Sequence, residues 1–194
     1  MKKDIILAGV GGQGILSIAT VIGSAALQQD LHLKQAEVHG MSQRGGDVQS
    51  NLRLSSEPIY SDLIPRGGAD LIVSLEPMEA LRYLPYLAAD GWIITNTAPL
   101  VNIPDYPSME SVLAELNRQP HVVALDVDAI AKDLGMPRAA NMVLLGAMAA
   151  LLGILEPDAL REGIRRVFAR KGDAVVESNI KAFDAGMEYA QKSK

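Results

Sequence analysis

The chain has 194 residues, 48% hydrophobic and 21% charged, with a formal net charge of −5, so we expect a single domain over residues 1–194 with a substantial core. The acidic balance argues against a general affinity for nucleic acid or anionic membranes. The absence of cysteine excludes disulfides, cysteine-ligated zinc, ordinary iron–sulfur ligation and a cysteine nucleophile in this chain.

The N-terminus predicts a short apolar strand over residues 5–8, a glycine-rich turn, and a buried helix from residue 15 to 22. The turn follows the pattern G-x-G-x-x-G. Such glycines allow a tight turn, close approach of the backbone to a ligand and close helix–strand packing. The helix N-terminus presents N–H groups and a positive dipole end to an anion. We therefore predict a cofactor or anion site at Gly9, Gly11, Gly12, Gln13 and Gly14, the alternative being a purely structural turn.

Residues 31–38 predict a second strand. Glu37 lies about where an acidic residue holds the ribose of a dinucleotide, but the polar, glycine-rich loop 39–47 that follows is foreign to an ordinary NAD domain. Residues 48–54 alternate except at Ser50, which predicts a half-exposed strand at a sheet edge or under a partner.

The remaining elements alternate between strands and helices. We predict a strand over 70–75, a helix from 78 to about 87 that starts at Glu76-Pro77, and a strand over 92–97. A short helix capped by Ser108 follows, then a strand over 122–127, a short helix closed by Gly135, and helices from Asn141 onward. This order favours an α/β fold with a doubly wound, mostly parallel sheet, Rossmann-like and three-layered, with a helical C-terminus.

Loop 39–47 carries most of the reactive side chains. In a parallel sheet it lies at the carboxyl end of the second strand, in the crevice where ligands bind. The guanidinium of Arg44, beside two glycines, suits a phosphate or carboxylate, and histidine changes charge near neutral pH. We predict Arg44 and His39 as catalytic, and Ser42, Gln43 and Gly45 as cofactor-binding. In the alternative, Arg44 pairs with a nearby carboxylate and His39 is a hydrogen-bonded turn residue.

Polar residues also end the later strands. Glu76 faces the same crevice, either capping the next helix or contacting a cofactor, and Asn96 and Thr97 hold the equivalent place one strand further. We expect Asn141 to cap its helix. The apolar run 142–155 has small residues that allow close helix packing, as core or as a subunit interface, and we expect core.

Several signatures are absent from the sequence. There is no G-x-S-x-G, no phosphate-binding G-x-x-x-x-G-K-[ST] and no metal-ligand spacing among the three histidines, so we predict no metal site. The N-terminus does not read as a signal peptide, and no apolar run reaches the roughly 20 residues of a membrane span. We expect a cytoplasmic protein with one ligand crevice and an incomplete catalytic set, which is typical of a subunit that works with a partner.

Residues 9–14 and 37–46, with Arg53, Asn141 and Asn179, resemble the gamma-type domain of 2-oxoacid:ferredoxin oxidoreductases, especially its indolepyruvate type. The resemblance implies a small subunit of a complex that oxidatively decarboxylates arylpyruvates to acyl-coenzyme A, with electrons passing to ferredoxin. It also implies that thiamine diphosphate and the iron–sulfur clusters belong to a large partner subunit, that this chain carries no cofactor, and that it is inactive alone. Two other functions stay open: a free-standing NAD(P)-dependent oxidoreductase, and a non-catalytic scaffold subunit.

Overall fold

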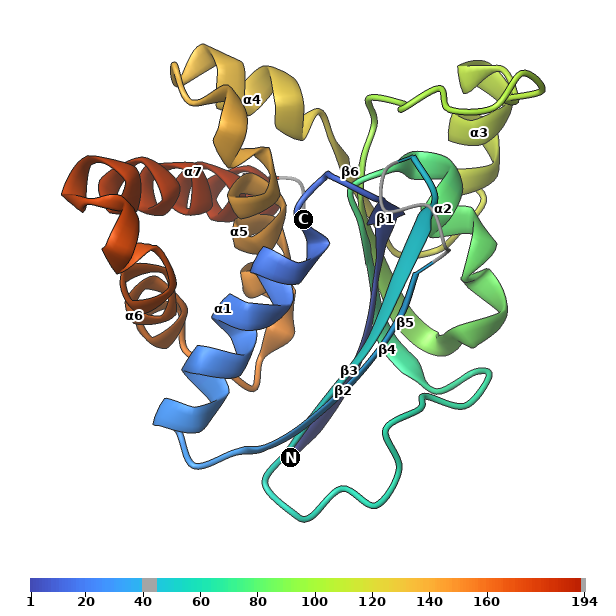
Figure 1. Ribbon diagram of the computed structural model, residues 1–194. Coiled ribbons are helices and arrows are strands. Elements are labelled where there is room, and N and C mark those ends of the chain that lie inside the picture. The colour runs from blue at the N-terminus through green and yellow to red at the C-terminus, as the bar shows by residue number, and fades with distance from the viewer. Residues whose placement is uncertain (40–44, 193–194) are drawn as a thin grey trace.

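A six-stranded sheet with the strand order β2-β3-β1-β4-β5-β6 organises the chain (Figure 1). The computed structural model describes residues 1–39 and 45–192. Strands β1, β4, β5 and β6 are parallel, and β3 is antiparallel to both β1 and β2, so β2 points the same way as β1. The predicted mostly parallel α/β sheet is confirmed. The strands are β1 (Lys2–Val10), β2 (His32–His39), β3 (Asp47–Ser55), β4 (Ala69–Ser74), β5 (Leu87–Asn96) and β6 (Val122–Leu125).

Strand β3 differs from its predicted position. It lies inside the sheet, pairing with β1 on one side and β2 on the other, so the prediction of a sheet edge is wrong, and β2 is the edge strand on this side of the sheet. Sequence periodicity reports which faces of a strand are covered but not which strands lie beside it. Leu52 and Leu54 are buried as the alternation predicted, and Ser50, which interrupts the pattern, is also buried.

Helices cover both faces of the sheet, as Figure 1 shows, and complete the predicted three layers. The N-cap at Ser108 is confirmed, because its hydroxyl accepts a hydrogen bond from the N–H of Ser111 at 3.3 Å. Within residues 1–39 and 45–192, no helix combines the length and apolar character needed to cross a membrane. One face carries α1 (Ile15–Gln28), α4 (Val127–Asp133), α5 (Ala140–Leu152), α6 (Pro157–Phe168) and α7 (Asp173–Lys192); the other carries α2 (Pro77–Arg82) and α3 (Met109–Leu116).

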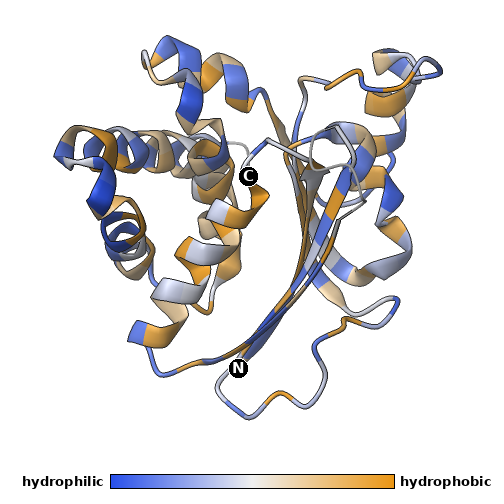
Figure 2. Ribbon diagram, viewed as in Figure 1, coloured by the Kyte–Doolittle hydropathy of each residue, from blue (hydrophilic) through white to orange (hydrophobic). Residues whose placement is uncertain are grey.

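Two hydrophobic cores lie on the two faces of the sheet. Because successive side chains of a strand point to opposite faces, β1 contributes Ile5 and Leu7 to the core under α1 and α5, and Ile6 and Ala8 to the core under α2 and α3. Figure 2 shows hydrophobic residues along the strands and along the helices that cover them.

Helices α5 and α7 cross at glycines. A Cβ atom at Gly146 would collide with the backbone oxygen of Phe183, and one at Gly186 would collide with the backbone oxygen of Val143. Residues 142–149 are buried, so the run of small residues in α5 forms core, as predicted. The absence of side chains at the crossing lets the two backbones touch.

A buried ion pair lies near the amino end of β1, at the opposite end of this strand from the glycine turn. The carboxylate of Asp4, whose side chain is 1% exposed, accepts from Nε of Arg53 at 2.8 Å and from Nη2 at 3.1 Å. Nη1 of Arg53 donates to the carbonyls of Ser61 and Leu63, and Lys2 Nζ lies 2.8 Å from Asp4. The pair therefore joins β1, β3 and the loop that follows β3.

Tyr83, in the core under α2 and α3, should make the free energy of unfolding depend on pH in the alkaline range. Burial, followed by the charges of Glu79 and Asp47, raises the pKa of its phenol from 10.0 to about 12. Because the unfolded state loses this proton first, the stabilising contribution is complete below pH 10 and is lost as the pH rises through 12. We expect the free energy of unfolding to fall over this interval, and to fall less in Tyr83→Phe, as measured by urea unfolding at each pH.

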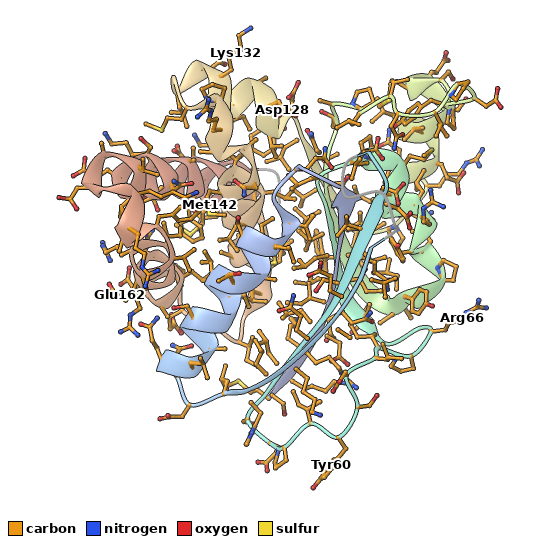
Figure 3. The ribbon with its side chains drawn as sticks, viewed as in Figure 1. Tyr60, Arg66, Asp128, Lys132, Met142 and Glu162 are labelled. Carbon is orange, nitrogen blue, oxygen red and sulfur yellow. The ribbon has the colours of Figure 1, made fainter. Side chains whose placement is uncertain are left out.

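Tyr60 provides the control for this titration, because its side chain is 93% exposed at the loop tip labelled in Figure 3. Tyr60→Phe should keep the pH dependence of the unmodified chain. An unchanged alkaline slope in Tyr83→Phe would show that the stability loss comes from other groups.

Candidate functional site

The carboxyl ends of β1, β4, β5 and β6 meet at one edge of the sheet, where the helices that follow them begin (Figure 1). The hairpin of β2 and β3 reaches the same edge, since Val10 is paired with Asp47 and His39 with Val48. Both ends of loop 39–47 therefore lie at the edge that carries the glycine turn. In open α/β sheets this is the edge at which ligands bind.

Hydrogen bonds join the two glycine-rich segments directly. The N–H of Gly11 donates to the carbonyl of Gly46 at 2.8 Å, and the N–H of Gly45 donates to that of Gly11 at 3.4 Å. Asn102 Nδ2 donates to the Gly45 carbonyl at 2.7 Å. The structure thus brings the glycine turn, the end of the predicted loop and the segment after β5 together. Three predicted site residues, Ser42, Gln43 and Arg44, lie outside the described residues, as does the side chain of His39.

Gln13 fastens the glycine turn to the end of β4. Its Oε1 accepts from the N–H of Val10 at 2.7 Å, and its Nε2 donates to the carbonyl of Leu75 at 3.0 Å. A Cβ at Gly9 would lie 2.9 Å from Gln13 Oε1, so the glycine at this position makes room for the Gln13 side chain. Gln13 thus has a structural role between β1 and β4, the neighbouring strands whose following helices, α1 and α2, lie on opposite faces of the sheet.

Gly14 is tied to a helix far along the chain. It precedes α1 with a φ of +90°, in the left-handed region, and no side chain caps the helix there. Asn141 Nδ2 donates to its carbonyl at 3.2 Å, and a Cβ at Gly14 would lie 2.6 Å from that nitrogen. The predicted capping role of Asn141 is wrong: Ala139 is the N-cap of α5, and Asn141 lies inside the helix. It holds the glycine turn instead.

Glu76 is buried and caps α2. Its Oε2 accepts from the N–H of Glu79 at 2.9 Å, while Oε1 accepts from the Tyr106 hydroxyl and, at 3.4 Å, from the N–H of Leu100. Burial and this hydrogen bond raise the pKa of the Tyr106 phenol. The structure supports the capping role, and cofactor contact by Glu76 stays a prediction.

Asn96 organises the next two strand ends. Its Nδ2 donates to Asp128 Oδ2 at 2.8 Å and to the carbonyl of Leu75 at 3.3 Å, and its Oδ1 accepts from the N–H of Val127 at 3.2 Å. Sequence reasoning placed Asn96 at this edge but missed Asp128, which has no motif around it. The only available signal was its position one residue into the helix after a strand.

A cavity of about 310 Å³ opens between the glycine turn and these residues. It contains amide groups, one carboxylate and one guanidinium, and so offers hydrogen bonds and charge without a paired nucleophile and base. No group of three His, Asp or Glu side chains in the described part of the chain is placed to hold a metal. The polar residues that line it are Gln13, Asn96, Asp128, Arg138 and Asn141.

The geometry opposes dinucleotide binding at this turn. In a nucleotide-binding α/β unit the second strand neighbours the first, whereas here β3 separates β1 from β2. Glu37 therefore stands two strand spacings, roughly 10 Å, from Leu7 of β1, and further from the glycine turn. In addition, the N–H of Gly11 in the glycine turn already donates to the carbonyl of Gly46.

Exposed apolar side chains also lie at the carboxyl edge. Val101 is 67% exposed, Val38 58%, Leu16 49% and Ile103 42%. They come from α1, β2 and the segment after β5, and Asn102 between two of them contacts Gly45. Exposed apolar surface concentrated at one site is typical of contact with another protein.

Comparisons with known proteins agree with this geometry. Residues 4–189 match the family described as pyruvate ferredoxin/flavodoxin oxidoreductase. Indolepyruvate oxidoreductase subunit IorB from Pyrococcus horikoshii is 37% identical, and the match covers 99% of this chain and 98% of that protein. The gamma subunit of keto/oxoacid ferredoxin oxidoreductase from Geobacter sulfurreducens has a TM-score of 0.72 at 26% identity, covering 98% and 99%. A 2-oxoglutarate:ferredoxin oxidoreductase chain from Magnetococcus marinus shares the fold over 31% of its length, with a TM-score of 0.76 at 23% identity.

Proposed function

Because this chain belongs to the pyruvate ferredoxin/flavodoxin oxidoreductase family, we propose that it is the small subunit of an indolepyruvate-type 2-oxoacid:ferredoxin oxidoreductase. The full-length similarity to an indolepyruvate oxidoreductase subunit supports the type. The reaction is the oxidative decarboxylation of an arylpyruvate to its coenzyme A thioester, with the electrons passing to ferredoxin.

The cofactors belong to a large partner subunit in this proposal. The chain has no cysteine, so it lacks the thiolates that iron–sulfur clusters require. Thiamine diphosphate on the partner supplies the carbanion chemistry of decarboxylation. The proposal therefore has the chain inactive alone, because the reaction depends on the cofactors of the partner.

The contribution of this chain is to complete the active site at the subunit interface. The observation that carries this role is the joining of Gly11 to Gly45 and Gly46 by hydrogen bonds at the carboxyl edge, which fixes the base of loop 39–47 beside the uncapped N-terminus of α1. The positive potential there suits the substrate carboxylate or a coenzyme A phosphate. The exposed side chains of Leu16, Val38 and Val101 provide apolar contact with the partner and exclude water.

Arg44→Ala should lower turnover of the assembled complex roughly tenfold to hundredfold, the value of a charged hydrogen bond to an anion, without unfolding the subunit. The measurement is dye reduction with arylpyruvate and coenzyme A. Arg66→Ala is the matched control, because Arg66 also precedes two glycines but lies exposed in the loop before β4, as labelled in Figure 3. Full activity of Arg44→Ala would remove the proposed role of Arg44.

Co-purification of the tagged chain from its native cell tests the assembly. We expect a large partner and a brown complex that reduces a dye with arylpyruvate and coenzyme A. A colourless chain that purifies alone and binds NAD(H) tightly would overturn the proposal in favour of a free-standing dehydrogenase. A complex whose activity survives changes at both Arg44 and Gly11 would instead identify a scaffold subunit.

A further inference from the structure

Segment 98–107 runs at the carboxyl edge of the sheet, from just after β5 to the start of α3 (Figure 1). It contains no helix or strand, and its prolines at positions 99, 104 and 107 supply no backbone N–H groups. All its residues are exposed or half-buried, and none belongs to either hydrophobic core. The position of this segment therefore depends on a few hydrogen bonds to residues outside it.

Glu76 anchors the segment at two points. One carboxylate oxygen, Oε1, accepts from the N–H of Leu100 at 3.4 Å and from the hydroxyl of Tyr106. Glu76 is 0% exposed, and it is fixed in turn by accepting from the N–H of Glu79 at the start of α2. Burial and the hydrogen bond with Glu76 raise the pKa of the Tyr106 phenol, so this hydroxyl remains a donor at neutral pH. The stretch from Leu100 to Tyr106 is thus closed on one buried oxygen.

Asn102 lies within this closed stretch and contacts the candidate site. Its Nδ2 donates to the carbonyl of Gly45 at 2.7 Å. Gly45 has a φ of +79°, and its N–H donates to the carbonyl of Gly11 at 3.4 Å. A chain of hydrogen bonds and short backbone connections therefore runs from Tyr106 and Glu76 through Asn102 and Gly45 to the glycine turn.

The two neighbours of Asn102 face outward. Val101 is 67% exposed and Ile103 is 42% exposed, and both belong to the apolar surface at the carboxyl edge. Asn102 thus stands between a surface suited to another protein and the residues that meet the glycine turn. A displacement of the stretch at this surface would alter the contact with Gly45.

We propose that Tyr106 is a positioning residue of the candidate site, acting through Glu76 and Asn102 on Gly45 and the glycine turn. Its hydroxyl keeps the stretch from Leu100 to Tyr106 closed, and Asn102 then holds the Gly45 carbonyl beside Gly11. The consequence for turnover rests on the proposed function, whereas the hydrogen bonds are present in this chain alone.

Hydrogen exchange of the Gly11 N–H in the full chain, followed by nuclear magnetic resonance, tests these contacts. This N–H donates to the carbonyl of Gly46, so it exchanges when that contact opens. Tyr106→Phe and Asn102→Ala should each accelerate the exchange roughly threefold to tenfold, the value of one hydrogen bond. The double variant should exchange no faster than Asn102→Ala, because Tyr106 acts through Asn102. Additive effects, or no effect of Tyr106→Phe, would overturn the proposal.

Two controls separate positioning from a general loss of stability. Tyr60→Phe removes the hydroxyl of a side chain that is 93% exposed, and it should leave the exchange of Gly11 unchanged. The N–H of Ile72, inside β4, should exchange equally in Tyr106→Phe and in the unmodified chain. Equal acceleration at Gly11 and Ile72 would show that Tyr106 stabilises the whole fold, which would overturn its positioning role.

Steady-state kinetics of the assembled complex test the consequence for turnover. Tyr106→Phe should lower kcat roughly threefold to tenfold and change the KM for arylpyruvate by less than about twofold, because misplacement costs orientation in the transition state. An unchanged kcat in an otherwise active complex would overturn the positioning role and leave the proposed function intact. A complex of the unmodified chain that does not turn over would overturn the proposed function, and the exchange of Gly11 would still decide whether Tyr106 acts through Asn102.

Discussion

Replacing Gly146 by alanine is expected to destabilise the chain by about 3 kcal/mol, at the upper end of what overpacking usually costs. The added methyl group would collide with the backbone oxygen of Phe183, so α5 and α7 would have to separate. Backbone atoms of two packed helices cannot give way as the end of a flexible side chain can. For a chain of this size the midpoint of thermal unfolding should fall by roughly 6–12 °C. The fluorescence of Trp92, the only tryptophan, reports the transition.

Gly23→Ala is the matched control in another helix. A Cβ at Gly23 would meet only Leu33 Cδ1, at 3.7 Å, which is ordinary contact. Alanine inside a helix is more stable than glycine by about 0.5–1 kcal/mol, so this variant should unfold at a slightly higher temperature. If Gly146→Ala and Gly23→Ala changed the midpoint alike, the close crossing of α5 and α7 would be contradicted.

Arg53→Met is expected to destabilise the chain by about 3 kcal/mol, because it leaves the carboxylate of Asp4 buried without its main partner. We expect the low end of the range known for such losses, since Lys2 Nζ stays 2.8 Å from the same carboxylate. The double variant Asp4→Asn/Arg53→Met removes the unpaired charge and should recover part of the loss. Urea unfolding of both single variants and the double variant measures the coupling.

An exposed pair provides the comparison for Arg53. Arg118 lies 2.6 Å from Glu115, but the side chains are 74% and 41% exposed, and exposed pairs contribute little. Arg118→Met should change the free energy of unfolding by less than about 0.5 kcal/mol. A loss for Arg53→Met as small as this would mean that the pair with Asp4 contributes no more than a surface contact.

The elements that could be predicted from the sequence were those with strong hydrophobic patterns. Their boundaries depended on single residues. The helix after β4 ends at Arg82 instead of near residue 87, because Pro85 cannot continue it, and β5 accordingly begins at Leu87. Strand β6 ends at Leu125 because the carboxylate of Asp126 accepts from the N–H of Ala129 and starts α4. Pro85 and Asp126 were both visible in the sequence, but the apolar residues around them extended the predicted helix and the predicted strand beyond their true ends.

The candidate site was predictable only in part. The approach of both ends of loop 39–47 to the glycine turn follows from strand direction, and the structure places Gly45 and Gly46 against Gly11. The contacts of Gln13 with Leu75 and of Asn141 with Gly14 join residues 62 and 127 positions apart. Hydrophobic periodicity carries no information about such pairs, because it describes neighbours along one element. The insertion of β3 between β1 and β2, which separates Glu37 from the turn, was unpredictable for the same reason.

The hydrogen bond from Asn141 to Gly14 has a consequence for how the chain folds while it is being synthesised. The glycine turn leaves the ribosome before α5, and the side chain that holds it is synthesised 127 residues later. Contacts between such distant residues form late, after the intervening chain has lost its freedom. A nascent chain that stops before α5 therefore contains the whole glycine motif without the residue that holds it. The glycine turn is therefore synthesised well before the contact that holds it can form.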